Sequence, residues 1–161
     1  MTMLRFAAIV GIGGSLLAVA IPAFWQGISA SKTSEALDGL GQLSRAAISQ
    51  AADRPVKDSF PPSVELTPAE VPRGIRALDP PRTWDHLTWR ALGFRFDYEH
   101  AYAFRFDSSF EPSNDLSRFS ARAHGDLDGD GNLSTFEVRG ERAKGADARL
   151  MAGLLVDREI E

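Results

Sequence analysis

The chain contains no cysteine among its 161 residues. This absence excludes disulfide bonds, metal sites built from thiolates and cysteine nucleophiles. A basic face is missing as well, since 18 Lys and Arg residues stand against 22 Asp and Glu residues, for a formal net charge of −4. Proteins that bind nucleic acid carry a basic surface or a recognisable motif. The sequence shows neither, so we expect no nucleic-acid partner.

Histidine is scarce, and His86, His100 and His124 are dispersed along the chain. No two of them have the spacing of paired metal ligands on one helix, and no serine lies in the context of a nucleophile elbow. We therefore expect neither an enzyme active site nor a small-molecule substrate.

Charged side chains are missing from residues 6–25, whose sequence is FAAIVGIGGSLLAVAIPAFW. A helix rises about 1.5 Å per residue, so a stretch of this length spans the roughly 30 Å hydrocarbon layer of a bilayer. Arg5 precedes the stretch, and a basic residue before a first apolar segment favours a cytoplasmic N-terminus. The sequence therefore predicts a transmembrane helix within residues 1–30. The expected topology has the N-terminus on the cytoplasmic side and the rest of the chain on the outer side of the membrane.

Two other interpretations of this stretch remain open. One is a cleaved secretory signal, with residues 1–5 as its basic start and residues 18–20 as the cleavage site. Against it, the apolar run continues past that site to Trp25, and Pro22 would crowd the cut. The other is a buried core helix, although a domain of this size seldom surrounds a helix that is apolar on every side.

Beyond this stretch, apolar residues recur every three or four positions: Leu37, Leu40, Leu43 and Ala47. This period predicts that the helix continues as an amphipathic segment over residues 31–52. The helix should stop near Asp53, because Pro55 disfavours helical geometry in the residue before it. One face of the segment is therefore expected to be covered, and a β-sheet is the expected cover.

Residues 53–161 are expected to form one globular head. Seven of the nine prolines fall in residues 53–82, which predicts an irregular connector. Residues 84–92 have the spacing of a short helix, with Gly93 as its C-terminal stop. Alternation of apolar and polar residues then predicts strands in five segments: residues 94–97, 102–107, 117–123, 133–139 and 150–156. The predicted fold class is α+β, with a long N-terminal helix, transmembrane and then amphipathic, packed on a small antiparallel sheet.

The segment AVAIPAFWQGISASKTSEALDGLGQL places a proline near the outer end of an apolar helix and follows it with a polar and then a leucine-bearing stretch. Over residues 7–47 this pattern resembles the N-terminal helix of type IV pilins and pseudopilins. The resemblance implies a pilin-like structural subunit of a type IV pilus or of a type II secretion-type filament. Its partners would be homo- or hetero-oligomeric pilin-like subunits and the membrane. The implied localisation is a single-pass inner-membrane protein with its head in the periplasm, or an extracellular filament. The implied membrane and assembly residues are Arg5, Ile9, Leu16, Pro22 and Phe24.

Two features differ from the family's pattern. The short basic leader ending in glycine is absent, and Arg5 stands seventeen residues before Pro22, where the family carries a glutamate. That glutamate is linked in the family to N-methylation and to the docking of an incoming subunit. A cation repeated along an apolar bundle is costly for each unpaired copy. Arg5 therefore favours a minor, initiating or non-assembling subunit over a major one.

Residues 126–137, with the sequence DLDGDGNLSTFE, match the twelve-residue calcium loop of an EF-hand. Calcium takes about six to eight oxygens at ~2.3–2.6 Å, and alternate carboxylates on a tight loop converge on one point. The candidate ligands are Asp126, Asp128, Asp130, Asn132, Ser134 and Glu137. The three aspartates are the principal ones, because side chains at 134 and 137 need not point back at the loop if they lie in a strand.

The flanks of this loop alternate in polarity and lack the apolar pattern of the two EF-hand helices. We therefore interpret the loop as a β-hairpin connection that holds Ca²⁺. Similar D-x-D-x-D-G loops occur in pseudopilins, which favours a metal site over plain turn chemistry, in which aspartates bond to their own backbone. The alternative function is a membrane-anchored or secreted calcium-binding domain with an EF-hand-like loop.

Overall fold

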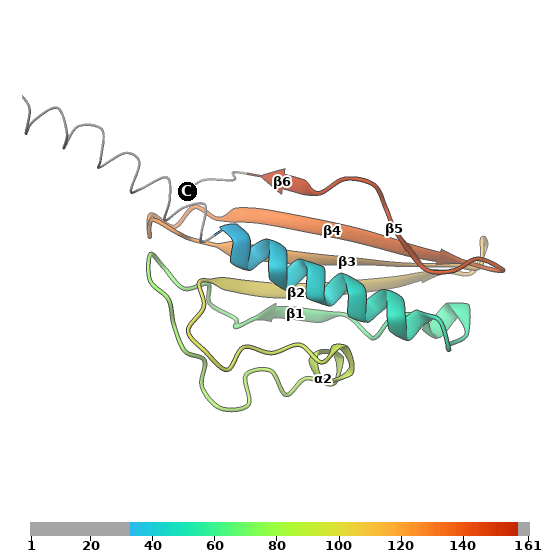
Figure 1. The fold of residues 1–161 in the computed structure, drawn as a ribbon, viewed down its shortest axis with the longest axis horizontal. Coiled ribbons are helices and arrows are strands. Elements are labelled where there is room, and N and C mark those ends of the chain that lie inside the picture. The colour runs from blue at the N-terminus through green and yellow to red at the C-terminus, as the bar shows by residue number, and fades with distance from the viewer. Residues whose placement is uncertain (1–32, 158–161) are drawn as a thin grey trace, which may run out of the picture. The chain divides into compact units, whose positions relative to one another are not determined.

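The computed structural model describes residues 33–157, and its first element is a helix over residues 33–51. The elements that follow are η1 (Val56–Asp58), β1 (Val64–Thr67), α2 (Leu87–Leu92), β2 (Tyr102–Glu111), β3 (Leu116–Gly125), β4 (Ser134–Ala143), β5 (Arg149–Leu150) and β6 (Leu155–Asp157). The strands form one antiparallel sheet in the order β1-β2-β3-β4-β5, and β6 also pairs with β4 (Figure 1).

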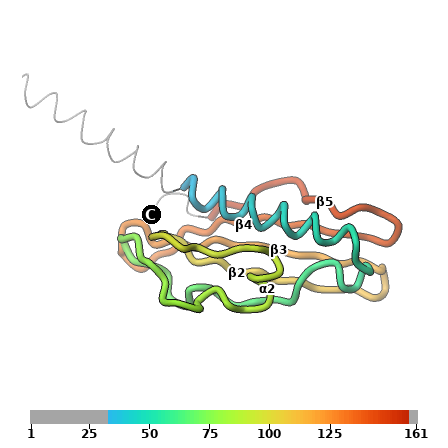
Figure 2. The backbone as a smooth tube through the Cα atoms, turned by 60° about the horizontal axis from the view of Figure 1, so that its bottom comes forward, coloured from blue at the N-terminus to red at the C-terminus, as the bar shows by residue number. Residues whose placement is uncertain are grey.

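The helix over residues 33–51 lies across one face of this sheet, as a second layer (Figure 1, Figure 2). Its apolar stripe is buried, with Leu40 and Leu43 no more than 1% exposed, and it packs against the phenylalanines of β2. Complete burial of a leucine side chain contributes about 1.5–3 kcal/mol. The predicted amphipathic helix with a sheet as its cover is therefore confirmed for these residues, and the helix ends two residues before Asp53.

The predicted class of an α+β protein organised by a long N-terminal helix is wrong. In the described residues the antiparallel sheet is the principal element, and the helix beside it extends over residues 33–51 only. This helix carries exposed polar side chains, Asp38 and Arg45 among them, on the side away from the sheet. Its apolar period thus reflects packing on the sheet, and the apolar stretch of residues 6–25 lies outside the described residues.

The predicted inner-membrane localisation is corrected as well. Between residues 33 and 157, no helix combines the length and the apolar character that a membrane crossing requires. The stretch on which the prediction rested, residues 1–30, lies outside the described residues.

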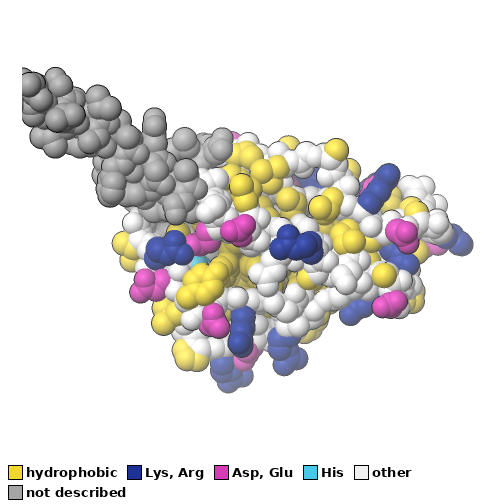
Figure 3. Space-filling view, in the orientation of Figure 1, with side chains coloured by type: hydrophobic (Ala, Val, Ile, Leu, Met, Phe, Trp, Pro, Cys, Tyr) yellow, Lys and Arg dark blue, Asp and Glu magenta, His cyan; other side chains and the backbone are white. Residues whose placement is uncertain are grey.

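The three central strands confirm the predictions for residues 102–107, 117–123 and 133–139, and each is longer than predicted. β2 and β3 pair over ten residues each, as do β3 and β4. Alternation gives the sheet an apolar face under the helix. The opposite face, called here the open face, carries Arg105, Asp107, Arg122 and Glu137. On the helix side, Figure 3 shows charges of both signs interspersed with hydrophobic side chains.

Residues 94–97 do not form the predicted strand, although their side chains do alternate between buried and exposed. Phe94 and Phe96 are buried, and Arg95 and Asp97 between and after them are exposed. The two rings pack edge-on against Trp84 at centroid distances of 5.5 and 5.6 Å. The segment is therefore covered on one side by an aromatic cluster and has no ladder partner.

The short helix α2 is confirmed, with Gly93 in the left-handed conformation at its C-terminus (φ 60°). Trp89 is fully buried in this helix, whereas Leu87 at its first position is 52% exposed. Trp89 Nε1 donates a hydrogen bond to Thr67 Oγ1 at 3.0 Å, which ties α2 to β1. At the other end of the chain, the predicted strand over residues 150–156 is replaced by the two short strands β5 and β6, both exposed.

Candidate metal site

Residues 126–133 form the loop between β3 and β4. The hairpin closes at the pair Gly125 and Ser134, and strands stand on both sides of the loop. The interpretation of this segment as a hairpin connection, without the two helices of an EF-hand, is confirmed.

The loop brings three carboxylates together. Asp126, Asp128 and Asp130 each offer one oxygen, and these oxygens all lie within 4.8 Å of one another. Two oxygens that each bind Ca²⁺ at ~2.3–2.6 Å are at most about 5 Å apart. The cluster therefore has the dimensions of a calcium site. Asp126 is buried and the other two side chains are exposed, so an ion at this position would retain access to water.

Backbone amides of the loop hold the carboxylates in place. Asp126 accepts hydrogen bonds from the N–H groups of Gly129 (2.8 Å) and Gly131 (3.2 Å). Asp128 accepts from the N–H of Asp130 at 3.1 Å. Turn chemistry alone would produce such bonds. Each carboxylate oxygen has two lone pairs, however, so a bond to one amide leaves capacity for a cation.

The remaining candidate ligands are used differently. Asn132 donates from its side-chain amide to Asp130 Oδ2 at 2.7 Å, which places it at the cluster. The Ser134 hydroxyl donates to the Gly125 carbonyl oxygen at 3.1 Å and closes the hairpin. Glu137 lies in β4, on the open face of the sheet, and its carboxylate does not belong to the group of three.

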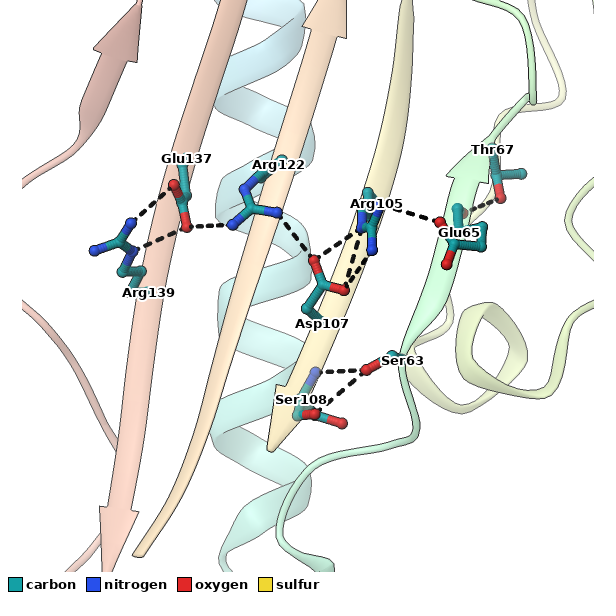
Figure 4. A network of polar contacts seen from close by, with 9 residues as sticks. All are labelled: Ser63, Glu65, Thr67, Arg105, Asp107, Ser108, Arg122, Glu137 and Arg139. Carbon is teal, nitrogen blue, oxygen red and sulfur yellow. Dashed lines mark hydrogen bonds and ion pairs between the residues drawn. The ribbon is translucent and has the colours of Figure 1, made fainter. Parts of the chain in front are cut away.

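Glu137 is part of a chain of ion pairs that crosses the open face of the sheet (Figure 4). Arg139 and Arg122 donate to its Oε1 at 2.9 and 3.3 Å. Burial alone would raise the pKa of Glu137, but the hydrogen bonds and charges of the two arginines outweigh it and lower the pKa from its ordinary value. The carboxylate is thus held as an anion by its strand neighbours.

The chain of ion pairs continues from Arg122 to Asp107, at 3.1 Å, and from Asp107 to Arg105, at 2.9 Å. Arg105 also pairs with Glu65 of β1 at 3.0 Å. Sequence reasoning missed this network. The sequence feature that could have indicated the network is the alternation of arginine and acidic residues along the strands. Which of these charges are neighbours follows only from the register of β2, β3 and β4.

The connector reaches the loop at a point that the sequence did not indicate. The Gly74 N–H donates to the Asp126 carbonyl oxygen at 2.8 Å, and Arg73 and Asp126 form an isolated parallel bridge. Beside them is an open cleft of about 650 Å³, lined in part by Glu70, Arg73 and Asp126. The connector has no hydrophobic period, so nothing local predicts this contact.

The helix residues assigned to the membrane and to assembly lie outside the described residues: Arg5, Ile9, Leu16, Pro22 and Phe24. No known protein family, curated protein or solved structure matches the chain.

Proposed function

We propose that this chain is a non-catalytic, pilin-like or pseudopilin-like structural subunit that binds Ca²⁺ at the tip of its β3–β4 hairpin. The chemistry of the loop and the placement of the helix over residues 33–51 support the two parts of this proposal. The partners are copies of the same chain or related pilin-like subunits.

The observation that carries the assembly role is the division of the helix into two sides. Leu40, Leu43 and Ala47 are buried on the sheet, whereas Leu37 is 41% exposed and Arg45 points away from the sheet. One side of the helix thus stabilises the domain, and the other side is available to a neighbouring subunit. The resemblance over residues 7–47 includes the first part of this same helix.

The calcium role rests on the convergence of Asp126, Asp128 and Asp130 within 4.8 Å. Mutual repulsion of three carboxylates is relieved when a divalent cation binds between them. Asn132 and water would complete the six to eight oxygens that Ca²⁺ takes.

A non-catalytic role also accounts for the histidines. His86 caps α2 by accepting a hydrogen bond from the Thr88 N–H at 3.2 Å. His124 Nδ1 lies 2.9 Å from Thr135 Oγ1, and burial together with the charges of two arginines lowers its pKa. His100 is buried and bonded to backbone and carboxylate. Each ring thus has structural partners within the described chain.

Site-specific crosslinking tests the assembly role. The chain has no cysteine, so single-cysteine variants of the full-length protein report on one position at a time. We expect Leu37→Cys and Arg45→Cys, in cells that produce the protein, to yield crosslinks to copies of the chain or to another pilin-like subunit, identified by mass spectrometry. Ser109→Cys, an exposed position on the open face, is the matched control.

Equal yields at all three positions, or monomer alone, would contradict the assembly role. The second candidate would then remain, a calcium-binding domain that does not assemble, which the three carboxylates favour independently. Calorimetric titration of the full chain with CaCl₂ tests the metal. If crosslinking succeeds but CaCl₂ gives no binding heat, the chain is an assembling subunit that does not bind Ca²⁺. The aspartates of the hairpin loop then serve only to form the turn.

A further inference from the structure

The two edges of the sheet differ in how they are protected. At one edge, β1 lies between Pro62 and Pro68, and α2 is bound beside it (Figure 1). The Trp89 indole donates to Thr67 of β1, and the Thr88 hydroxyl donates to the Pro62 carbonyl oxygen at 2.7 Å. Proline and a covering helix keep an edge strand from pairing with another chain. The opposite edge consists of β5 and β6, and within residues 33–157 no strand pairs with their outer side.

This second edge is apolar. Five of the eleven large hydrophobic side chains that are exposed in the described residues belong to it, each of them 41–51% exposed: Leu150, Met151, Leu154, Leu155 and Val156. No charged residue interrupts the run over residues 150–156. Figure 3 shows hydrophobic side chains gathered along the border of the molecule where β5 and β6 lie. A contiguous apolar patch of this kind marks a site of interaction.

The run presents apolar side chains to both faces of the sheet. Leu155 pairs with Glu137 and lies on the open face, whereas Val156 pairs with Phe136 and lies on the helix face. A strand with one face in water alternates between apolar and polar residues, and a continuous apolar run is typical of a strand that is covered on both faces. The edge therefore has the composition of an interior strand.

The backbone of the edge determines the kind of partner. The outer side of an edge strand presents a row of N–H and C=O groups, and another extended backbone can pair with them in series. The partner that fits β5 and β6 is therefore a strand.

The charges at the two ends of the run indicate that this strand belongs to a second copy of the chain. The run begins after Arg149 and ends before Asp157, and both side chains are exposed on the open face. When two copies of one strand pair antiparallel about a two-fold axis, the first residue of each lies opposite the last residue of the other. Opposite charges then meet at both ends, and the apolar residues meet between them. A parallel pair would instead place like charges side by side.

Both end charges have capacity for this contact. Arg149 donates from Nε and Nη2 to Oε1 of Glu141, at 3.2 and 2.8 Å, and its side chain is 76% exposed. A guanidinium has five N–H donors, so others remain for a carboxylate of the second copy. The Asp157 carboxylate has no ion pair with another described residue.

We propose that residues 149–157 form a self-complementary interface, in which two copies of the chain pair edge to edge and antiparallel about a two-fold axis near Gly153. β5 of each copy lies opposite β6 of the other, so the two sheets join. The contact uses neither the calcium loop nor the outer side of the helix over residues 33–51, and it stands or falls separately from them.

Two cysteine variants of the full chain, purified with different tags, test the two-fold arrangement. One carries Leu150→Cys and the other Val156→Cys, and a short thiol-specific crosslinker is added to each variant alone and to the mixture. We expect severalfold more crosslinked dimer in the mixture, because position 150 of one copy lies near position 156 of the other. Glu65→Cys replaces either partner as the matched control, since its side chain is 85% exposed at the protected edge.

Reversal of the end charges in these two variants tests the ion pairs. With Asp157→Arg in both, two cations meet at each end, and the yield should fall by about tenfold. With Asp157→Arg in the Val156→Cys copy and Arg149→Asp in the Leu150→Cys copy, opposite charges meet again, and the yield should return. All substituted side chains are exposed, so the fold should be retained.

Three outcomes would overturn the proposal. The first is a mixture that yields no more crosslinked dimer than either variant alone or than the mixture with Glu65→Cys. The second is a loss from Asp157→Arg that the exchanged pair does not restore. The third is crosslinking of Leu150→Cys, in cells that produce the full chain, exclusively to a different protein, which would assign the edge to that partner.

Discussion

Gly39 of the helix touches the ring of Phe104 in β2 so closely that a Cβ at position 39 would lie 2.6 Å from Cζ of that ring. Glycine inside a helix costs about 1 kcal/mol relative to alanine, and by itself it weakens the helix. Here it permits the close approach of helix and sheet, because the buried ring occupies the space of a side chain. Gly41, one half-turn on, has only the flexible guanidinium of Arg45 near its Cβ position, at 3.2 Å.

The first prediction compares these two glycines. Gly39→Ala should lower the free energy of unfolding by about 1–3 kcal/mol, since the ring of Phe104 is enclosed and must shift. Gly41→Ala should raise it by up to about 1 kcal/mol, because helix propensity improves and Arg45 can move aside. Urea denaturation of the full chain measures both. Shifts of the same sign in the two variants would show that the contact with Phe104 does not limit the approach of the helix.

The second prediction concerns Ca²⁺. A ligand that binds only the folded form stabilises it by about 2.7 kcal/mol at a hundredfold excess over Kd. The melting temperature should therefore rise with Ca²⁺ and fall with chelator, and Mg²⁺ should do less because it gives up its waters reluctantly. Asp128→Ala should abolish most of this response. Glu137→Gln should keep it, because Glu137 pairs with arginines on the open face. A calcium response that survives Asp128→Ala would place the ion elsewhere.

The third prediction concerns Asp107, which separates two like charges. Arg105 and Arg122 are directly opposite in the register of β2 and β3, and Asp107 pairs with both, at 2.9 and 3.1 Å. Asp107→Asn removes both ion pairs and leaves two cations side by side. We expect a loss of about 1 kcal/mol, smaller at high salt, because these side chains are about one-third exposed. Asp85→Asn, which breaks one exposed pair, should have almost no effect on the unfolding midpoint.

The fourth prediction concerns acid. The pKa of Glu137 is lowered in the folded protein by Arg139 and Arg122, which outweigh the opposing effect of burial. A carboxylate with a lowered pKa contributes stability above its ordinary pKa of 4.5, and this contribution is lost as the pH falls through the lower folded value. Unfolding free energies measured from about pH 6 downward should therefore fall more steeply in the wild type than in Glu137→Gln. Parallel curves would mean that the arginines do not stabilise the anion.

Features that depend on neighbours along the chain were determined by the sequence itself. Apolar residues that recur at every second position in residues 102–107 and 117–123 were enough to indicate strands. Apolar residues that recur every three or four positions were enough to indicate which side of the helix over residues 33–51 is buried. The spacing of Asp126, Asp128 and Asp130 on a tight turn brings their carboxylates together, because a few residues suffice to close the loop.

Features that depend on what lies opposite were decided by the tertiary structure. The register of β3 and β4 set Glu137 beside Arg122 and away from the calcium loop. The absence of a ladder partner left residues 94–97 outside the sheet, although their alternation is that of a strand. The fold also brought Asp79 and His100 together in the interior. The residues of the pairs Glu137–Arg122 and Asp79–His100 are 15 and 21 positions apart in sequence. An alternating pattern indicates which face of a sheet a side chain lies on, but it does not indicate which residue the side chain contacts there.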